Sequence, residues 1–279
     1  MLLEAVLINR NNIFMKAIKI IAVAFLILSL GTLSAQNDNS VKELIKVQDI
    51  IDTAYTNSRV VMMNEAHSGQ KRNIRTRIMG QLVLPKAHKH GVRVLAMEAL
   101  TEPFAKEANA TRKLPEAPNK LAYLHHPEMR NLMQAALDLG WDLAAYEANI
   151  KERPKMDNPV DQSNWREKQQ AENLANVLKQ LDKDAKILVW CGNSHHSKEP
   201  GVIPGGDFYP MGYQFWQITG IEPFVIDQIK TVDFMGDNSR YQQWAVYEKQ
   251  LKRNFYGTMG FVDKATKTAI IISTDNALE

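Results

Sequence analysis

Short apolar runs that end in polar side chains recur along the chain. The run that starts at Arg59 contains valine and methionine without a charge and stops abruptly at Asn64, Glu65 and His67. Uninterrupted runs of this kind are typical of parallel strands that are covered on both faces. The pattern therefore predicts buried strands in the segment after Arg59 and at 92–97, 141–146, 187–190 and 223–229. Two further short strands are expected near 244–247 and 268–273.

Between these runs, apolar residues recur at the spacing of amphipathic helices. The expected helices are one that uses Val41 to Ile51, one after Lys71 with a kink or break at Pro85, one at 129–139, one at about 162–181 and one at 211–218. The segment 101–127 is polar and has no sustained period, so a long excursion over the strand ends is expected there. An irregular loop is expected from His196 to Tyr209.

Strands that alternate with helices predict a single α/β domain with a mostly parallel central sheet covered by helices on both faces. The chain has 279 residues, of which 45% are hydrophobic, so it is long enough for one large core. No linker argues for two domains. The expected domain covers residues 36–279.

Residues 1–35 have the pattern of a Sec-type signal peptide. Lys16 and Lys19 precede an apolar segment from Ile20 to Leu30, and small residues lead to a cleavage site before Gln36. The natural start is possibly Met15. The apolar segment is shorter than the roughly 20 residues of a membrane-spanning helix. The expected product is exported, periplasmic or extracellular, without stable membrane insertion after cleavage.

Composition narrows the function classes. The formal net charge is +3 and the basic residues are spread along the chain, so nucleic acid is not an expected partner. The single cysteine, Cys191, excludes an intramolecular disulfide and a cysteine-based zinc site.

Four of the predicted strands end in residues that carry chemistry: Glu65 with His67, Glu98, Glu147 and His195. Parallel strands bring their carboxyl ends to one edge of a sheet, where ligands bind in open α/β folds. Carboxylates beside imidazoles either orient a histidine that takes a proton from water or hold a divalent metal. The alternative is that each glutamate only caps the helix that follows its strand. We expect Glu65, His67, Glu98 and His195 to converge in one pocket.

Several segments together resemble the superfamily of erythromycin esterases, ChaN-type haem-uptake proteins and Tiki-type proteases. The segments are NEAH at 64–67, LAMEAL at 95–100, AAYEA at 144–148, WREKQQAENLANVL at 165–178, VWCGNSHHSK at 189–198 and MGYQFW at 211–216. The resemblance covers roughly residues 59–229. Two positions depart from its pattern, because Asn64 replaces a usual glycine and Gly192 stands where the macrolide esterases tend to carry a histidine.

The resemblance implies an exported hydrolase that cleaves an ester or amide bond of a small-molecule or peptide substrate. It assigns water activation to Glu65 and His67, with Glu98 and His195 as further catalytic residues. Arg166, Glu147 and Asn193 are expected to contact the substrate. The departure at Gly192 argues against macrolide hydrolysis.

A haem- or metal-binding uptake protein is the alternative that this resemblance leaves open. Tyr209 and Tyr213, with Met211 between them, are possible haem contacts, since tyrosine ligates haem iron in some proteins. The sequence does not decide between metal-free chemistry, a divalent metal and haem. The cofactor therefore stays unknown at this point.

Overall fold

The computed structural model describes residues 42–66, 70–116, 122–231, 244–253 and 257–274. The expected signal peptide lies outside these residues, as does His67. From Glu43 onward the described residues belong to one compact unit. Among the described residues, no helix has the length and apolar composition that a membrane span needs.

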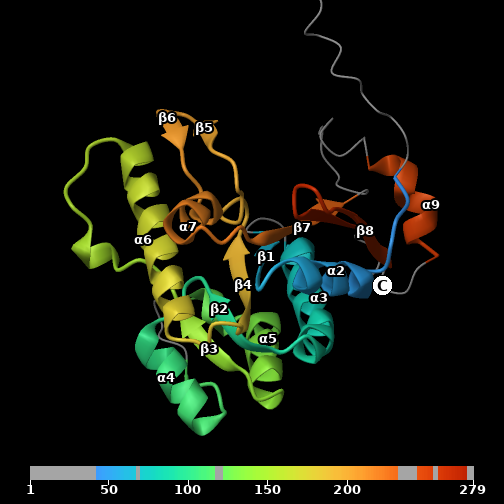
Figure 1. Ribbon diagram of the computed structural model, residues 1–279, viewed down its shortest axis with the longest axis horizontal. Coiled ribbons are helices and arrows are strands. Elements are labelled where there is room, and N and C mark those ends of the chain that lie inside the picture. The colour runs from blue at the N-terminus through green and yellow to red at the C-terminus, as the bar shows by residue number, and fades with distance from the viewer. Residues whose placement is uncertain (1–41, 67–69, 117–121, 232–243, 254–256, 275–279) are drawn as a thin grey trace, which may run out of the picture. The chain divides into compact units, whose positions relative to one another are not determined.

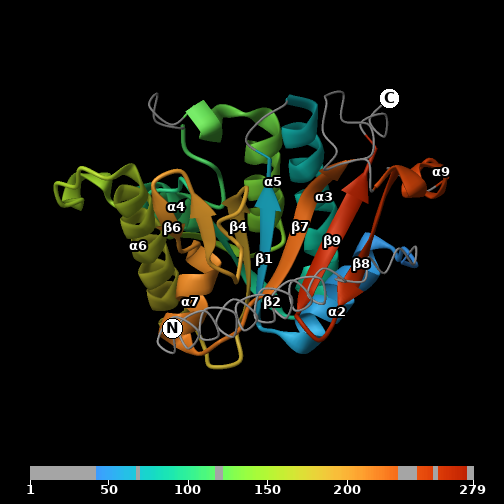
Figure 2. The ribbon, with the colours of Figure 1, turned by 90° about the horizontal axis from the view of Figure 1, so that it is seen from above.

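A seven-stranded sheet forms the centre of this unit (Figure 1, Figure 2). Its strand order is β3-β2-β4-β1-β7-β9-β8, and every neighbouring pair is parallel except β8 and β9. The strands are β1 (Val60–Glu65), β2 (Val92–Met97), β3 (Asp142–Ala145), β4 (Lys186–Gly192), β7 (Phe224–Thr231), β8 (Thr258–Asp263) and β9 (Thr268–Ser273). A separate antiparallel hairpin consists of β5 (Gly201–Ile203) and β6 (Gly206–Phe208).

Helices connect the strands and cover the sheet. The α-helices are α2 (Val47–Asn57), α3 (Gln70–Lys89), α4 (Glu102–Thr111), α5 (Pro127–Asp138), α6 (Pro159–Lys179), α7 (Met211–Thr219) and α9 (Glu248–Leu251). Short 3₁₀ helices are η1 (Ala122–His125), η2 (Ile150–Glu152) and η3 (Ala245–Tyr247).

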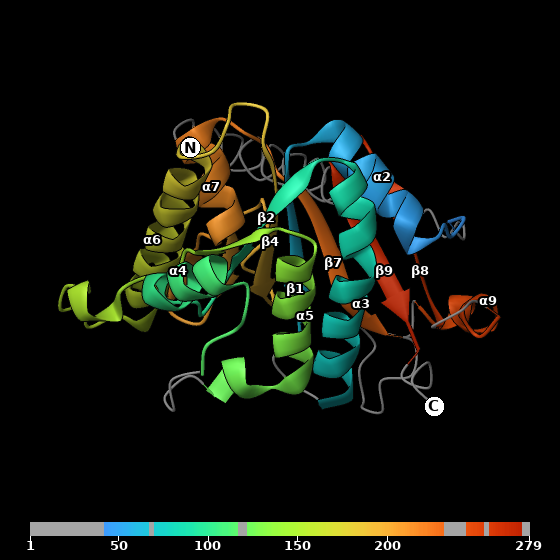
Figure 3. The ribbon, with the colours of Figure 1, turned by 90° about the horizontal axis from the view of Figure 1, so that it is seen from below.

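The two faces of the sheet have separate hydrophobic cores. One core packs residues of α2, α3, α4 and α5 against alternate sheet residues such as Met63 and Trp190. The other packs α6 and α7 against the intervening residues, including Met62 and Cys191. Figure 3 shows α3 and α5 on the first face, and Figure 2 shows α6 and α7 on the second. The predicted fold class, a mostly parallel sheet covered on both faces, is confirmed.

Several predicted elements match closely because their apolar runs are long and uninterrupted. The strands predicted at 92–97 and 268–273 have these bounds in the structure. The other predicted strands differ by a few residues at their ends, as does α6.

Other local expectations are wrong. Residues 245–247 form a 3₁₀ helix instead of a strand, and β8 was not predicted. Pro85 neither breaks nor ends α3. The buried contacts of Val83, Leu84 and Ala87 on the same helix hold it through the missing hydrogen bond.

Two segments expected to be irregular contain regular structure. The polar excursion after Thr101 includes α4, whose buried face is only Phe104, Ala105 and Ala108 and therefore gives a weak periodic signal. The loop expected after His196 contains the β5–β6 hairpin, whose strands are too short to show alternation.

Candidate functional site

The carboxyl ends of β2, β4 and β1 lie side by side, with β4 in the middle. Glu65 at the end of β1 pairs in register with Gly192 at the end of β4. Glu98 directly follows β2, and its backbone N–H donates to the carbonyl of Trp190 on β4. His195 lies in the turn after β4, where its N–H donates to the Gly192 carbonyl. The topology thus brings Glu65, Glu98 and His195 to one rim of the sheet.

His195 is held by Glu167 of α6. Its Nδ1 lies 2.6 Å from one carboxylate oxygen of Glu167 and 2.8 Å from the other. The Glu167 side chain is 2% exposed, and one of its oxygens also accepts a 2.8 Å hydrogen bond from the N–H of Met211 at the start of α7. The positive end of a helix dipole favours an ionised carboxylate there. Glu167 therefore accepts the Nδ1 proton and leaves Nε2 as the nitrogen that exchanges protons.

Glu98 faces the other ring nitrogen of His195. Its Oε1 lies 3.5 Å from Nε2, which is an ion-pair distance and longer than a good hydrogen bond. The same oxygen accepts a 2.6 Å bond from Arg166, and Oε2 accepts a 2.7 Å bond from the backbone N–H of Gly192. These two donors fix the carboxylate while Nε2 keeps the capacity to bind a water molecule.

Arg166 connects this pair to the end of β3. Its Nε and Nη2 bind both oxygens of Glu147 at 3.0 and 2.6 Å, the bidentate geometry that suits a guanidinium. Gln170, one turn further along α6, also donates to Glu147. Among the described residues, Nη1 of Arg166 has no hydrogen-bond partner, and the side chain is 29% exposed. Arg166 thus retains a donor for a bound molecule.

The charges of the site shift its pKa values in opposite directions. Burial lowers the pKa of His195, but the hydrogen bond from Glu167 and the charges of Glu98 and Glu167 outweigh burial, so this pKa is raised. Burial raises the pKa of Glu98, but the charges of His195 and Arg166 and the bonds from Arg166 and Gly192 bring it below its usual value. The arrangement therefore stabilises an imidazolium next to a carboxylate.

Glu65 belongs to a second cluster on the other face of the sheet. Its carboxylate accepts bonds from Arg77 of α3 at 2.9 and 3.3 Å and from the indole of Trp190 at 3.0 Å. Glu65 is fully buried and Arg77 nearly so. Glu65 shares its face with Met63 and Trp190, whereas Glu98 contacts α6 on the opposite face. The described contacts do not include one between Glu65 and His195.

Asn64, one of the departures from the expected pattern, ties the strand ends together. Its side-chain N–H donates to the Asn193 carbonyl and to Asp227, and its Oδ1 accepts from the N–H of Gln228. Asn193 has a φ of 39°, a left-handed conformation that asparagine tolerates. The Asn193 side chain is exposed, and its backbone N–H donates to the Glu65 carbonyl. Asn64 thus supports the turn that carries His195.

Gly212 allows α7 to approach this turn. Its N–H donates to the His195 carbonyl at 2.7 Å. A Cβ at position 212 would lie 2.4 Å from the carbonyl oxygen of His196, closer than real Cβ contacts. A glycine is therefore required for Met211 to reach Glu167.

Sequence reasoning grouped Glu98, Glu147, Arg166 and His195, and the structure brings these four together. It assigned no role to Glu167. The signal was present, because Glu167 occupies the first position of the stripe that continues with Ala171, Leu174 and Leu178. A carboxylate in an otherwise apolar stripe is buried and needs a partner.

The alternative of haem or metal binding gains no support from the tyrosine segment. The Met211 side chain is fully buried in the core beneath α6 and α7. Tyr209 and Tyr213 pack against each other, with ring centroids 6.0 Å apart. Among the described residues, no group of three or more histidine, cysteine, aspartate or glutamate side chains is arranged to hold a metal ion.

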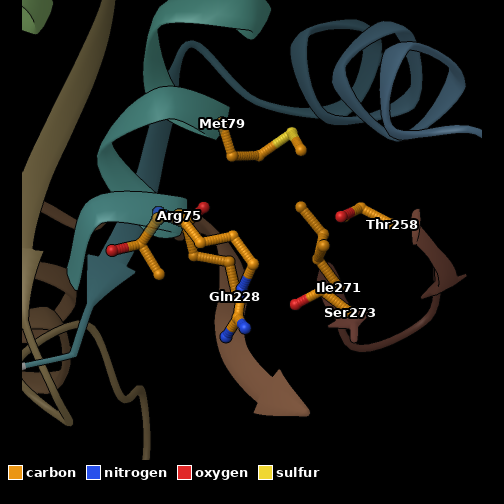
Figure 4. A pocket seen from close by; sticks show the side chains of 7 residues that line it. Arg75, Met79, Gln228, Thr258, Ile271 and Ser273 are labelled. Carbon is orange, nitrogen blue, oxygen red and sulfur yellow. The ribbon is translucent and has the colours of Figure 1, made fainter. Parts of the chain in front are cut away.

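A small hollow lies away from this rim, between the first half of α3 and the edge strands β7, β8 and β9 (Figure 4). Gln228 lines it, and the side-chain N–H of this residue donates to the Asn64 carbonyl. None of Glu98, Glu147, Arg166, Glu167 and His195 lines the hollow. The polar network at the strand ends and this hollow are therefore separate features.

Comparison with known proteins matches no family model and no curated protein. Solved structures of bacterial toxins and effectors are similar. RRSP, a MARTX toxin effector domain from Vibrio vulnificus CMCP6, is 15% identical with a TM-score of 0.49, over 68% of this chain and 37% of that chain. The type III effector HopBA1 is 14% identical with a TM-score of 0.47, over 86% of this chain and 100% of that one.

The C-terminal region of Pasteurella multocida toxin, described as having a thiol-protease-like catalytic triad, is 15% identical with a TM-score of 0.45. This match covers 66% of this chain and 25% of that chain. The chain thus spans well under half the length of the toxins it matches, apart from HopBA1.

These findings contradict the expected membership in the superfamily of erythromycin esterases, ChaN-type and Tiki-type proteins. Polar residues collect at the ends of parallel strands in many folds, so short motifs at these positions do not identify a family. Two of the quoted segments also have local structural causes, since Asn64 supports a turn and Gly212 permits a close contact. The described chain is an α/β unit that is similar to bacterial toxin and effector domains.

Proposed function

We propose that this protein is a hydrolase that cleaves an ester or amide bond with a water molecule activated by His195. The contact between the buried Glu167 carboxylate and Nδ1 of His195, at 2.6 Å, is the observation that carries the proposal. A carboxylate in this position fixes the tautomer and orientation of a general base. The 16% exposure of the His195 side chain leaves the ring accessible to water and substrate.

In the proposed reaction, Nε2 of His195 takes a proton while the water oxygen attacks the carbonyl carbon. The charge that develops on the carbonyl oxygen is stabilised by Nη1 of Arg166. Glu98 and Glu167 stabilise the imidazolium, which then gives its proton to the leaving oxygen or nitrogen as the bond to carbon breaks. Glu147 and Gln170 position Arg166 and do not take part in proton transfer.

Other nucleophiles of this chain suit the reaction less well. Cys191 is fully buried, and burial together with the charges of Glu98, Glu167 and Glu65 raises the pKa of its thiol well above the usual value. A thiolate is the reactive form of cysteine, so this residue is a poor nucleophile. Ser194 adjoins His195 in the same turn, but its side chain makes no hydrogen bond with His195 among the described residues.

His67, the base expected from the sequence, lies outside the described residues and stays a prediction. His195 takes the role in this proposal because its orientation by Glu167 is visible. Glu65 is assigned to the rigidity of the rim, since Arg77 and Trp190 occupy its carboxylate.

A panel of simple esters, lactones and peptides tests the proposal. The purified protein is expected to hydrolyse at least one class, and the same rate with and without a chelator would assign the activity to the side chains alone. Failure to hydrolyse any of the three classes would contradict the proposal.

A further inference from the structure

Tyr123 lies at the same rim, on the 3₁₀ helix η1 that precedes α5. The guanidinium carbon of Arg77 is 5.1 Å from the centre of the Tyr123 ring, a cation–π distance. The ring packs against the core of the α3 and α5 face. Tyr123 thus joins the Glu65–Arg77 cluster from above the strand ends.

The hydroxyl oxygen of Tyr123 is buried and has no hydrogen-bond partner among the described residues. Buried hydroxyls in native proteins are usually paired, because an unpaired buried group is unfavourable. Tyr146 shows the usual case nearby, since its buried hydroxyl donates to the Trp190 carbonyl at 2.7 Å. The unpaired hydroxyl of Tyr123 therefore needs an explanation beyond packing.

The surroundings keep this hydroxyl protonated. Burial raises the pKa of Tyr123 well above its usual value, and the negative charges of Glu65 and Glu98 raise it further. Both carboxylates act on the hydroxyl because they end the strands on either side of β4. Tyr123 is thus a hydrogen-bond donor at any pH at which the protein works.

Tyr123 and Arg166 approach the end of β4 from opposite faces of the sheet. Tyr123 packs with the α3 and α5 face, whereas Arg166 extends from α6 on the other. Each has a donor without a partner among the described residues, the hydroxyl in one case and Nη1 in the other. Two donors at one point are the arrangement that stabilises the oxyanion of acyl transfer.

We propose that the Tyr123 hydroxyl is the second oxyanion donor of the site, paired with Arg166 across the end of β4. This inference rests on the proposed hydrolase function. It narrows the substrate to molecules whose carbonyl oxygen reaches between the two residues. The bond that Tyr123 forms is made as the oxyanion develops, so its loss affects the rate more than ground-state binding.

The test compares Tyr123→Phe with Tyr146→Phe on an ester or peptide hydrolysed by the wild-type protein. Tyr123→Phe keeps the ring over Arg77 and removes only the hydroxyl. It is expected to lower kcat by about 10- to 1000-fold, the range for a lost oxyanion donor, with little change in KM. Its Tm is expected to stay at or above the wild-type value because no hydrogen bond is lost.

Tyr146→Phe is the matched control, since it removes a hydroxyl that does have a partner. It is expected to lower the Tm. Wild-type kcat in Tyr123→Phe, or a fall in its Tm as large as that of Tyr146→Phe, would overturn the role of Tyr123. Hydrolysis that is lost in His195→Ala but retained in Tyr123→Phe would overturn this inference alone. A wild-type protein without activity would overturn the proposed function as well.

Discussion

The two ring nitrogens of His195 contact different carboxylates. Glu167 binds Nδ1 closely, and Glu98 faces Nε2 at 3.5 Å. Together they raise the pKa of His195 despite its burial. Because the proposed base works only when it is neutral, this raised pKa sets the lower limit of the pH range in which the protein is active.

The rate is therefore expected to fall in acid with a midpoint above about 6.5, the ordinary histidine value. Glu167→Gln removes a negative charge that raises the pKa of His195, so the midpoint should move to lower pH. The plateau rate should also fall, because the imidazolium is less stabilised. The measurement is kcat/KM against pH for both proteins.

Glu172→Gln is a matched control on the same helix, since Glu172 is 39% exposed and does not contact His195. Its acid midpoint should equal that of the wild type. A Glu167→Gln midpoint that stays in place, or moves up, would show that Glu167 does not tune His195.

At the level of single residues, the sequence predicts some site members and not others. Glu98, Glu147 and His195 were predictable because each follows an uninterrupted apolar run. Glu167 and Tyr123 were not, since their roles depend on how α6 and η1 pack over the strand ends. The partner of Glu65 was also hidden, because Arg77 lies on the helix that follows its own strand and looks like a surface residue in the sequence.

Helices α6 and α7 position the site through one close contact. Gly212 brings the start of α7 against the turn that carries His195, and the N–H of Met211 reaches Glu167 as a result. The contact depends on the absence of a side chain at position 212. The order of the site therefore depends on how these two helices pack.

Gly212→Ala is expected to reduce the free energy of unfolding by about 1–3 kcal/mol, the usual cost of overpacking a well-packed contact. The opposing atom is a backbone oxygen, which yields less easily than a side chain. Urea denaturation measures the change. Activity should fall in parallel because α7 moves away from Glu167.

Gly201→Ala is the control substitution, as a Cβ at that glycine has no atom within 4 Å. Its unfolding free energy should change by less than about 0.5 kcal/mol, as for most surface substitutions. Equal stability of the two variants would show that the close approach at Gly212 is not needed.

At the level of elements, prediction succeeded where an apolar pattern was long. β2 and β9 were predicted with their observed bounds. The hairpin of β5 and β6 has three residues in each strand, too few for a period, and it depends on α6, whose Asn164 side chain donates to the Asp207 carbonyl. Such elements form through contacts between distant segments and are not visible in local sequence.

On the scale of the whole unit, the strand order explains why the site forms where it does. β4 lies between β1 and β2, although it follows both in the chain. Its end therefore receives side chains from α3 on one face and from α6 on the other. The parallel sheet was predictable from the alternation of strands and helices. The division of the glutamates between two faces was not, since it depends on the register of each strand.

The most direct test of the central claim is the rate of hydrolysis by His195→Ala, measured with and without added imidazole. The account predicts a fall in kcat/KM of about 100- to 10,000-fold and partial recovery with imidazole. His126→Ala, which alters an exposed histidine, should keep the wild-type rate. Wild-type activity in His195→Ala would contradict the account. So would a loss of activity in His67→Ala that imidazole restores, while His195→Ala remains active.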